Sequence, residues 1–128
     1  MVEKQIKYLK LNDIEAYRIS FALSNYVWEI VNRWEYFHKK TIGSQFTDAV
    51  DSISAIIAEG FGRYTKRDKI RFNRISFGSM YESLDWNEKA KIRKLISKNE
   101  YDHIYSELQK LPKSINSLIN YTNTKLKL

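Results

Sequence analysis

The sequence has no cysteine, one proline and four glycines among its 128 residues. Without cysteine, a disulfide framework and a thiolate metal site are both excluded. A β-sandwich needs a turn signal every ~8–12 residues, and so few glycines and prolines do not supply them. No stretch approaches the ~18 consecutive apolar residues of a membrane span, so we expect no membrane partner. An all-α protein is the fold class that these absences favour.

The composition is typical of a globular protein, because 43% of the residues are hydrophobic, too many for a disordered chain. The length predicts a single domain over residues 1–128 with its own core. The opening segment Met1–Gln5 lacks the apolar core of a secretory signal. We therefore expect a cytoplasmic protein.

Apolar spacing predicts four helical segments. The first covers residues 13–34, with Asn12 as its N-cap and Glu15 at the reciprocal capping-box position. A link over residues 36–44 leads to the second, over residues 45–59. Its apolar residues form a single stripe: Phe46, Ala49, Val50, Ile53, Ile56 and Ile57.

Glycines are expected to end the second helix, because Gly60 and Gly62 readily take the left-handed conformation found at helix C-termini. The third helix is predicted over residues 66–96. Thr65 stands at its N-cap and Asp68 at the capping-box position.

The fourth helix begins near Asn99, and its apolar residues keep an a/d spacing: Tyr101, Ile104, Leu108, Leu111, Ile115 and Leu118. Pro112 removes a backbone hydrogen bond to Leu108 and costs about 3 kcal/mol in a helix interior. We predict a kink or break near Leu111, with the same face continuing beyond it. Short links between long helices favour an antiparallel up-down-up-down four-helix bundle.

The first and third helices carry more apolar side chains than one buried stripe needs. On the first helix they are Ile19, Phe21, Leu23, Tyr26 and Trp28; on the third they are Ile70, Phe72, Ile75, Phe77, Met80, Tyr81, Leu84 and Trp86. A monomeric bundle buries about a third of each helix surface. We expect a second copy of the chain to cover the surplus, although a thicker core is the alternative.

The net charge of +7 favours an anionic partner such as nucleic acid, or serves solubility alone. Basic residues crowd positions 63–74, opposed only by Asp68. We expect six residues there to contact RNA or DNA: Arg63, Tyr64, Lys66, Arg67, Arg71 and Arg74. Arginine forks suit phosphate oxygens, and Tyr64 offers a ring for stacking on a base. The alternative is a solvated face, or arginines that pair with acidic groups of an adjacent protomer.

The centre of the chain carries an ordered set of short motifs. They are Gln45-Phe46, Ser52-Ile53, Ile57-Ala58-Glu59-Gly60-Phe61-Gly62-Arg63, Ile70-Arg71-Phe72, Gly78-Ser79 and Glu82. In order and spacing they resemble the S23-like four-helix-bundle family named for the protein encoded in 23S rRNA intervening sequences. Departures from that family are Ser54-Ala55-Ile56 in place of a usual proline and asparagine, Asp48 in place of a basic residue, and the added Pro112.

The resemblance implies a closed ring of five bundles and no enzymatic activity. Distant relatives are accessory proteins of diversity-generating retroelements, where they bind a reverse transcriptase and nucleic acid. Within the shared motifs, the small residues Gly78 and Ser79 are expected to let a neighbouring helix approach closely.

A metal site is a minority interpretation. Glu35-x-x-His38 and Glu100-x-x-His103 each match half of the di-iron bundle pattern, which also needs two further glutamates at the same level. Those glutamates are not at that level, and both pairs lie at helix ends. No nucleophile stands in a set with a base either.

These patterns predict a non-enzymatic, oligomeric bundle that binds nucleic acid as an accessory protein, with no catalytic residue, metal or cofactor. One alternative is a scaffold that recruits another protein and has no role with nucleic acid. The remote alternative is a di-metal carboxylate enzyme.

Overall fold

The computed structural model describes residues 10–125, which are helical and contain no strand. In chain order the elements are a 3₁₀ turn η2 (Leu11–Asp13), α1 (Glu15–Val31), α2 (Tyr36–His38), a π-helix η3 (Lys39–Gly43), α3 (Ser44–Phe61), α4 (Lys66–Ile92) and α5 (Lys98–Lys125). The segment Met1–Gln5, on which the expectation of no signal peptide rests, lies outside the described residues.

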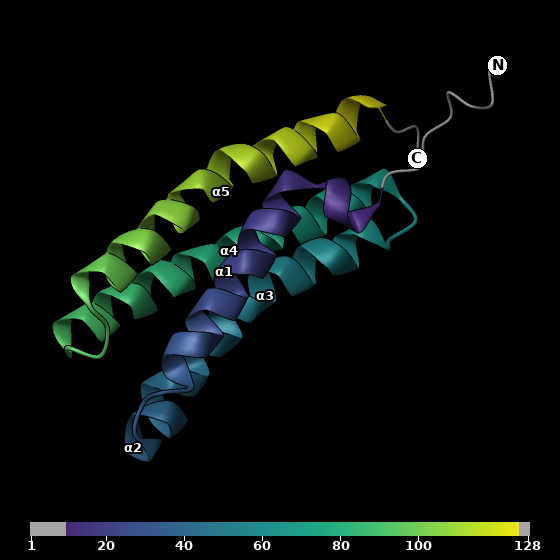
Figure 1. The fold of residues 1–128 in the computed structure, drawn as a ribbon. Helices are drawn as coiled ribbons and strands as arrows, with labels where there is room; N and C mark the ends of the chain where they lie inside the picture. Colours follow the sequence, from purple (N-terminus) through teal and green to yellow (C-terminus); the bar gives the residue numbers. More distant parts are fainter. Residues whose placement is uncertain (1–9, 126–128) are drawn as a thin grey trace.

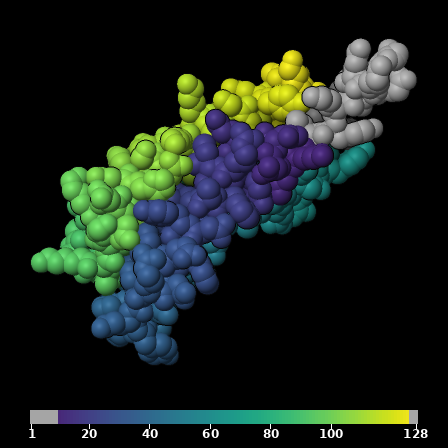
Figure 2. Space-filling view, in the orientation of Figure 1, coloured from purple at the N-terminus to yellow at the C-terminus, as the bar shows by residue number. Residues whose placement is uncertain are grey.

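The four long helices form a bundle and lie lengthwise beside one another (Figure 1). Helices α1 and α4 each pack against both α3 and α5. In the space-filling view α1 covers the front of the molecule and borders α5 (Figure 2). The all-α bundle predicted from the sequence is confirmed. Within residues 10–125 no helix combines the length and the apolar character that crossing a membrane requires.

The core is built from the predicted stripes of α3 and α5. Eight of their side chains have no exposed surface: Phe46, Val50, Ile53, Ile57, Ile104, Leu108, Leu111 and Ile115. Of the kink or break predicted near Leu111, the break is wrong, because α5 continues through Pro112. The burial of Leu111 and Ile115 on either side offsets the cost of the proline. The same face continues beyond Pro112, as predicted.

The start of α1 differs from the prediction. Asn12 does not cap it; the N-cap is Ile14, with no side-chain hydrogen bond. Upstream, the backbone N–H of Lys10 donates to a carboxylate oxygen of Asp13 (2.8 Å), which closes the short turn η2. The carboxylate of Glu15 instead accepts a hydrogen bond from the Ser114 hydroxyl (2.9 Å) and so ties α1 to α5.

The predicted link over residues 36–44 is also wrong, because this segment is helical and leads directly into α3. It includes the π-helix η3, whose last residue, Gly43, is buried. A Cβ at Gly43 would lie 2.8 Å from Val31 Cγ1 and 2.9 Å from the carbonyl oxygen of His38. The glycine therefore lets this wide turn pack against the end of α1.

Gly62 is the C-cap of α3, so a glycine ends this helix as predicted, but the predicted left-handed conformation is wrong. Among the described residues no glycine has a positive φ, and α3 runs on to Phe61. Gly60 is buried inside α3, where a Cβ would lie only 2.8 Å from Phe72 Cβ on α4. No atom lies within 4 Å of the corresponding position at Gly78. Within the chain, the close approach of two helices predicted for Gly78 occurs instead at Gly60.

The start of α4 agrees with the prediction, and its end does not. The Thr65 hydroxyl accepts a hydrogen bond from the backbone N–H of Asp68 (3.1 Å), the expected N-cap. The helix ends at Ile92 rather than at residue 96, because Lys94 adopts a positive φ of 59°.

Only part of the apolar surplus expected on α1 and α4 lies at the surface of the described chain. Leu23 and Met80 are buried, and the thicker-core alternative holds for Ile19, Tyr26, Ile70, Phe77, Leu84 and Trp86, which pack partly buried against the core. Phe21 and Trp28 on α1 are 50% and 52% exposed. Ile75 and Tyr81 on α4 are 43% and 63% exposed. The buried residues of α4 are mostly small or polar: Asn73, Ser76, Met80, Ser83, Asn87 and Ala90.

Replacing Gly60 and Gly78 separately by alanine should have opposite effects. Gly60→Ala forces α3 and α4 apart at Phe72 and should lower the free energy of unfolding by about 1–3 kcal/mol. Gly78→Ala meets open space and should raise it by up to about 1 kcal/mol, because alanine favours a helix. Urea denaturation at equal protein concentration measures both, and equal effects would contradict this packing.

Candidate nucleic-acid interface

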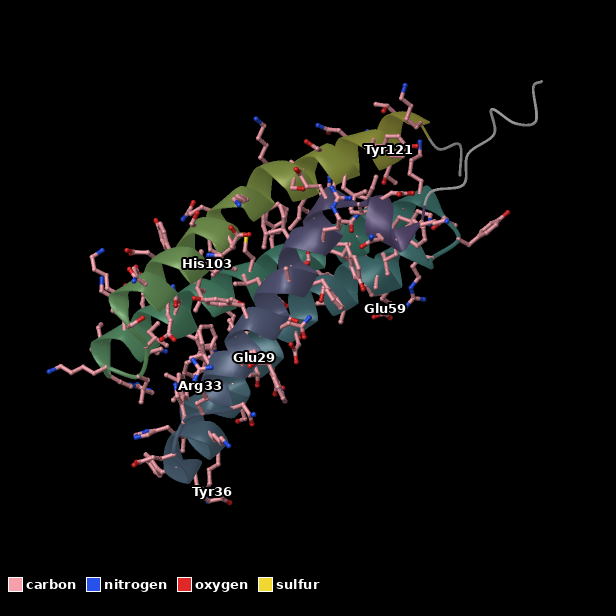
Figure 3. All side chains as sticks on the ribbon, in the orientation of Figure 1. Glu29, Arg33, Tyr36, Glu59, His103 and Tyr121 are labelled. Atoms are coloured by element: carbon pink, nitrogen blue, oxygen red, sulfur yellow. The ribbon has the colours of Figure 1, made fainter. Side chains whose placement is uncertain are left out.

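The predicted basic cluster lies at one end of the bundle. Arg63 and Tyr64 belong to the turn between α3 and α4, and the remaining members lie in the first turns of α4. Figure 1 shows this turn at the end of the molecule opposite α2. In Figure 3 the labelled Glu59 lies towards the same end, and Tyr36 lies at the other. The fold therefore brings all six predicted residues into one region.

Three arginines form the outward face of this region. Arg67, Arg71 and Arg74 are exposed and, together with Ile75, line a shallow hollow along α4. All three arginines therefore share one face of α4. Among residues 10–125, Arg71 has a long ion-pair contact, 3.9 Å from its Nε to Asp68, whereas Arg67 and Arg74 have no acidic partner.

An aromatic ring organises two members of the cluster. The guanidinium carbons of Arg63 and Arg71 lie 4.4 Å and 5.0 Å from the centre of the Phe72 ring. Each such cation–π contact contributes about 0.5–1 kcal/mol at an exposed site. Arg63 also pairs with Glu59 at 2.8 Å, so its position is fixed from two sides. From the sequence, Phe72 was assigned to the apolar surplus and to the motif Ile70-Arg71-Phe72, but not to the basic cluster. The adjacent Arg71 was the only local signal for that role.

Two lysines have structural partners. The Lys69 ammonium donates to the carbonyl oxygen of Phe61 (2.7 Å) at the end of α3, and burial lowers the pKa of this lysine. The Lys66 ammonium donates to the carbonyl oxygen of Asn123 on α5 (3.2 Å). Lys66, one of the predicted site residues, thus joins α4 to α5 while adding its charge to the region.

Tyr64 stands out from the turn and is 76% exposed. Most of its ring is therefore accessible to solvent, as stacking on an unpaired base requires. Together the region offers exposed guanidinium groups and an aromatic face, a combination suited to phosphates and bases.

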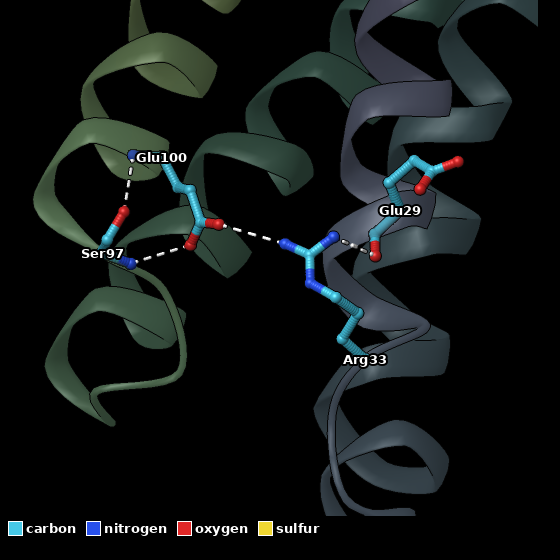
Figure 4. Close-up of polar contacts among 4 residues, drawn as sticks. All are labelled: Glu29, Arg33, Ser97 and Glu100. Atoms are coloured by element: carbon cyan, nitrogen blue, oxygen red, sulfur yellow. Dashed lines mark hydrogen bonds and ion pairs between the residues drawn. The ribbon is translucent and has the colours of Figure 1, made fainter.

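One of the two Glu-x-x-His pairs, Glu100 with His103, makes other contacts. His103 packs its ring against Tyr26, with 4.3 Å between ring centres. Glu100 accepts from the backbone N–H of Ser97 (2.9 Å) and from the guanidinium of Arg33 (3.3 Å), as Figure 4 shows. Within the part of the chain that the structure describes, no group of three or more metal-ligating side chains is placed to hold an ion.

The Glu100 contacts form a capping box that the sequence reasoning missed. The Ser97 hydroxyl accepts a hydrogen bond from the backbone N–H of Glu100 (3.1 Å). In return, the Glu100 carboxylate accepts a hydrogen bond from the backbone N–H of Ser97. The Ser-x-x-Glu spacing at the start of a helix is the signal that identifies such a box. Arg33 also donates to the carbonyl oxygen of Glu29 (3.0 Å), so the ion pair holds the end of α1 to the start of α5.

Comparison with known proteins supports the resemblance noted in the central motifs. The family model described as 23S rRNA-intervening sequence protein matches residues 12–117. A crystal structure of a protein with unknown function from the S23 ribosomal protein family of Bacteroides thetaiotaomicron is similar, with a TM-score of 0.72 and 18% identity. The alignment covers 81% of this chain and 97% of that one, and it shows a shared fold. Among curated proteins none matches this chain significantly.

Replacing Phe72 by leucine should increase the side-chain mobility of Arg63 and Arg71 without affecting the other arginines of the cluster. Leucine keeps the apolar contact with α3 but removes the ring, so the unfolding free energy should fall by less than about 1.5 kcal/mol. The side chains of Arg63 and Arg71 should become more mobile, measured by ¹⁵N relaxation of their Nε–H groups. Arg74, which has no contact with the ring among those described, is the internal control. Unchanged mobility at Arg63 and Arg71 would contradict the role of Phe72.

Proposed function

This chain belongs to the 23S rRNA-intervening sequence protein family, and we propose that it is a non-enzymatic accessory protein that binds the phosphates of RNA or DNA. We further propose that its helices run in antiparallel up-down-up-down order and that copies of the chain assemble into a ring-like homo-oligomer, a pentamer as the family resemblance implies. The proposal includes a cytoplasmic location.

The observation that carries the proposal is the outward arginine face of α4. Arg67 and Arg74 are exposed without an acidic partner among residues 10–125, so their guanidinium groups are available to an anion. The stretch from Arg67 to Arg74 spans about 10 Å at the helical rise of ~1.5 Å per residue. The arginines therefore lie far enough apart along the helix to contact more than one phosphate of the same strand. Each guanidinium fork can bind two phosphate oxygens.

Self-association rests on a different surface. Phe21 and Trp28 leave about half of their surface in water on α1. Burial of exposed aromatic side chains in an interface is favourable, and aromatic residues are enriched at the centres of interfaces. In a ring the arginine face repeats once per copy, so that one nucleic acid engages several copies and gains affinity through avidity.

Replacing Arg67, Arg71 and Arg74 together by alanine should weaken binding to every RNA and DNA sequence alike. Because each lost phosphate contact removes about 0.7–0.9 from the slope of log affinity against log salt, the slope should flatten by about 2–3. Fluorescence anisotropy with labelled oligonucleotides across a salt titration measures both quantities.

A matched control removes the same charge at the other end of the bundle. Lys91, Arg93 and Lys98 are exposed there, and their combined replacement by alanine also lowers the net charge by three. This control should retain most of the affinity and of the salt slope. Equal losses in both triple variants would mean that net charge alone attracts nucleic acid. No binding by the unmodified protein at low salt would replace the proposal with the protein-scaffold alternative.

A further inference from the structure

The outward face of α4 continues past the arginines. Helical geometry puts Arg67, Arg74 and Tyr81 on one stripe, because successive members are seven residues apart, close to two turns. Gly78 lies between the last two, one turn after Arg74. Tyr81 is 63% exposed, and the space above Gly78 is open. The arginine hollow is therefore followed by bare backbone and then by a second exposed aromatic ring.

In chain order, one exposed tyrosine precedes the residues of the hollow and another follows them. Tyr64 precedes it in the turn before α4 and is 76% exposed, and Tyr81 follows it. Ile75, 43% exposed, gives the hollow itself one apolar wall. This alternation of aromatic ring, arginines and aromatic ring is what a strand with both phosphates and accessible bases requires.

We propose that this face binds a single-stranded nucleic acid rather than a duplex, and that Tyr64 and Tyr81 each stack on an unpaired base. The proposal rests on the proposed function and specifies its ligand. We call this binding face the α4 track. Its residues are Tyr64, Arg67, Arg71, Arg74, Gly78 and Tyr81.

Base accessibility decides between the two forms of nucleic acid. In a duplex the faces of the bases are covered by their stacked neighbours, so a surface tyrosine reaches only the sugar–phosphate backbone. In a single strand each base has a free π-face, and stacking on an aromatic side chain strengthens binding whatever the base. Two exposed tyrosines therefore add affinity for a single strand and little for a duplex.

Gly78 suits this ligand. Glycine is disfavoured in a helix interior, and no neighbour in the described chain requires the absence of a side chain there. Because Gly78 has no side chain and the space above it is open, a base or sugar can lie directly against the helix backbone at this position. The position thus fits a ligand that approaches more closely than a side chain would allow.

Acidic side chains limit how far the α4 track extends beyond Tyr81. Glu82 and Asp85 are exposed on the following turn of α4, where Asp85 pairs with Lys89 at 2.6 Å. The Glu82 carboxylate accepts a hydrogen bond from the indole N–H of Trp86 (3.2 Å). Carboxylates repel phosphates, so the strand leaves the helix near Tyr81.

The test compares single-stranded and double-stranded oligonucleotides of the same sequence, as RNA and as DNA, by fluorescence anisotropy with the full chain. Tyr64→Ala and Tyr81→Ala should each weaken single-strand binding by about 5- to 150-fold, the range of one lost stacking contact. The salt slope should not change, because no charge is removed. Duplex binding, which is expected to be weaker in the unmodified protein, should not respond.

Matched variants separate stacking from other effects. Tyr64→Phe and Tyr81→Phe keep the ring and should restore single-strand affinity. Tyr36→Ala removes a similarly exposed tyrosine, 73%, at the opposite end of the bundle and should bind as the unmodified protein does (Figure 3).

Three results would overturn the α4 track while leaving phosphate binding intact. They are duplex binding as tight as single-strand binding, unchanged affinity in both alanine variants, and a shift of oligomeric state in Tyr81→Ala by sedimentation velocity. The last would make this face a contact between copies of the chain. Failure of the unmodified protein to bind any oligonucleotide would instead reject the proposed function itself.

Discussion

The close contact between α3 and α4 at Gly60 and Phe72 is the constraint on which the candidate site depends. Because Gly60 has no side chain, Phe72 can lie against α3, where a Cβ would come within 2.8 Å of it. The same ring carries the guanidinium groups of Arg63 and Arg71 on its surface. At this junction Lys69 binds the last carbonyl of α3, which fixes the turn from which Tyr64 projects. Packing in the bundle thus sets the geometry of the basic region directly.

The inner face of α4 determines which side of this helix meets solvent. Its seam is made of small and polar residues such as Asn73, Ser76 and Ser83, each buried. These small side chains let α4 come close to its neighbours, while Ile70, Phe77, Leu84 and Trp86 pack partly buried against the core beside them. The arginines occupy the opposite side as a consequence. One side of α4 therefore contributes to the stability of the bundle, and the opposite side forms the proposed binding face. Residues on the exposed side can be changed with little effect on the core.

Much of the fold follows from local patterns, and most of the errors come from residues whose roles depend on tertiary contacts. The stripes of α3 and α5 and the Thr65 cap were predictable, because burial at a period of 3.6 and a capping hydroxyl are local signals. Gly60 was misread, since glycine serves both left-handed helix ends and close helix contacts, and only the packing against Phe72 distinguishes them. The helical segment from Tyr36 to Gly43 includes a π-turn, which has no comparable sequence signature. The basic cluster was predictable from charge alone, whereas the partners of Lys66 and Arg63 required the arrangement of three helices.

The central claim is that the outward face of α4 is where nucleic acid binds. Amide chemical-shift mapping of the full chain, titrated with a short single-stranded RNA, tests this claim most directly, because it locates the contact without altering any residue. The account predicts shifts concentrated between Tyr64 and Tyr81, with α2 and the start of α5 unaffected. Shifts centred on α2, or on the exposed aromatic face of α1, would contradict it.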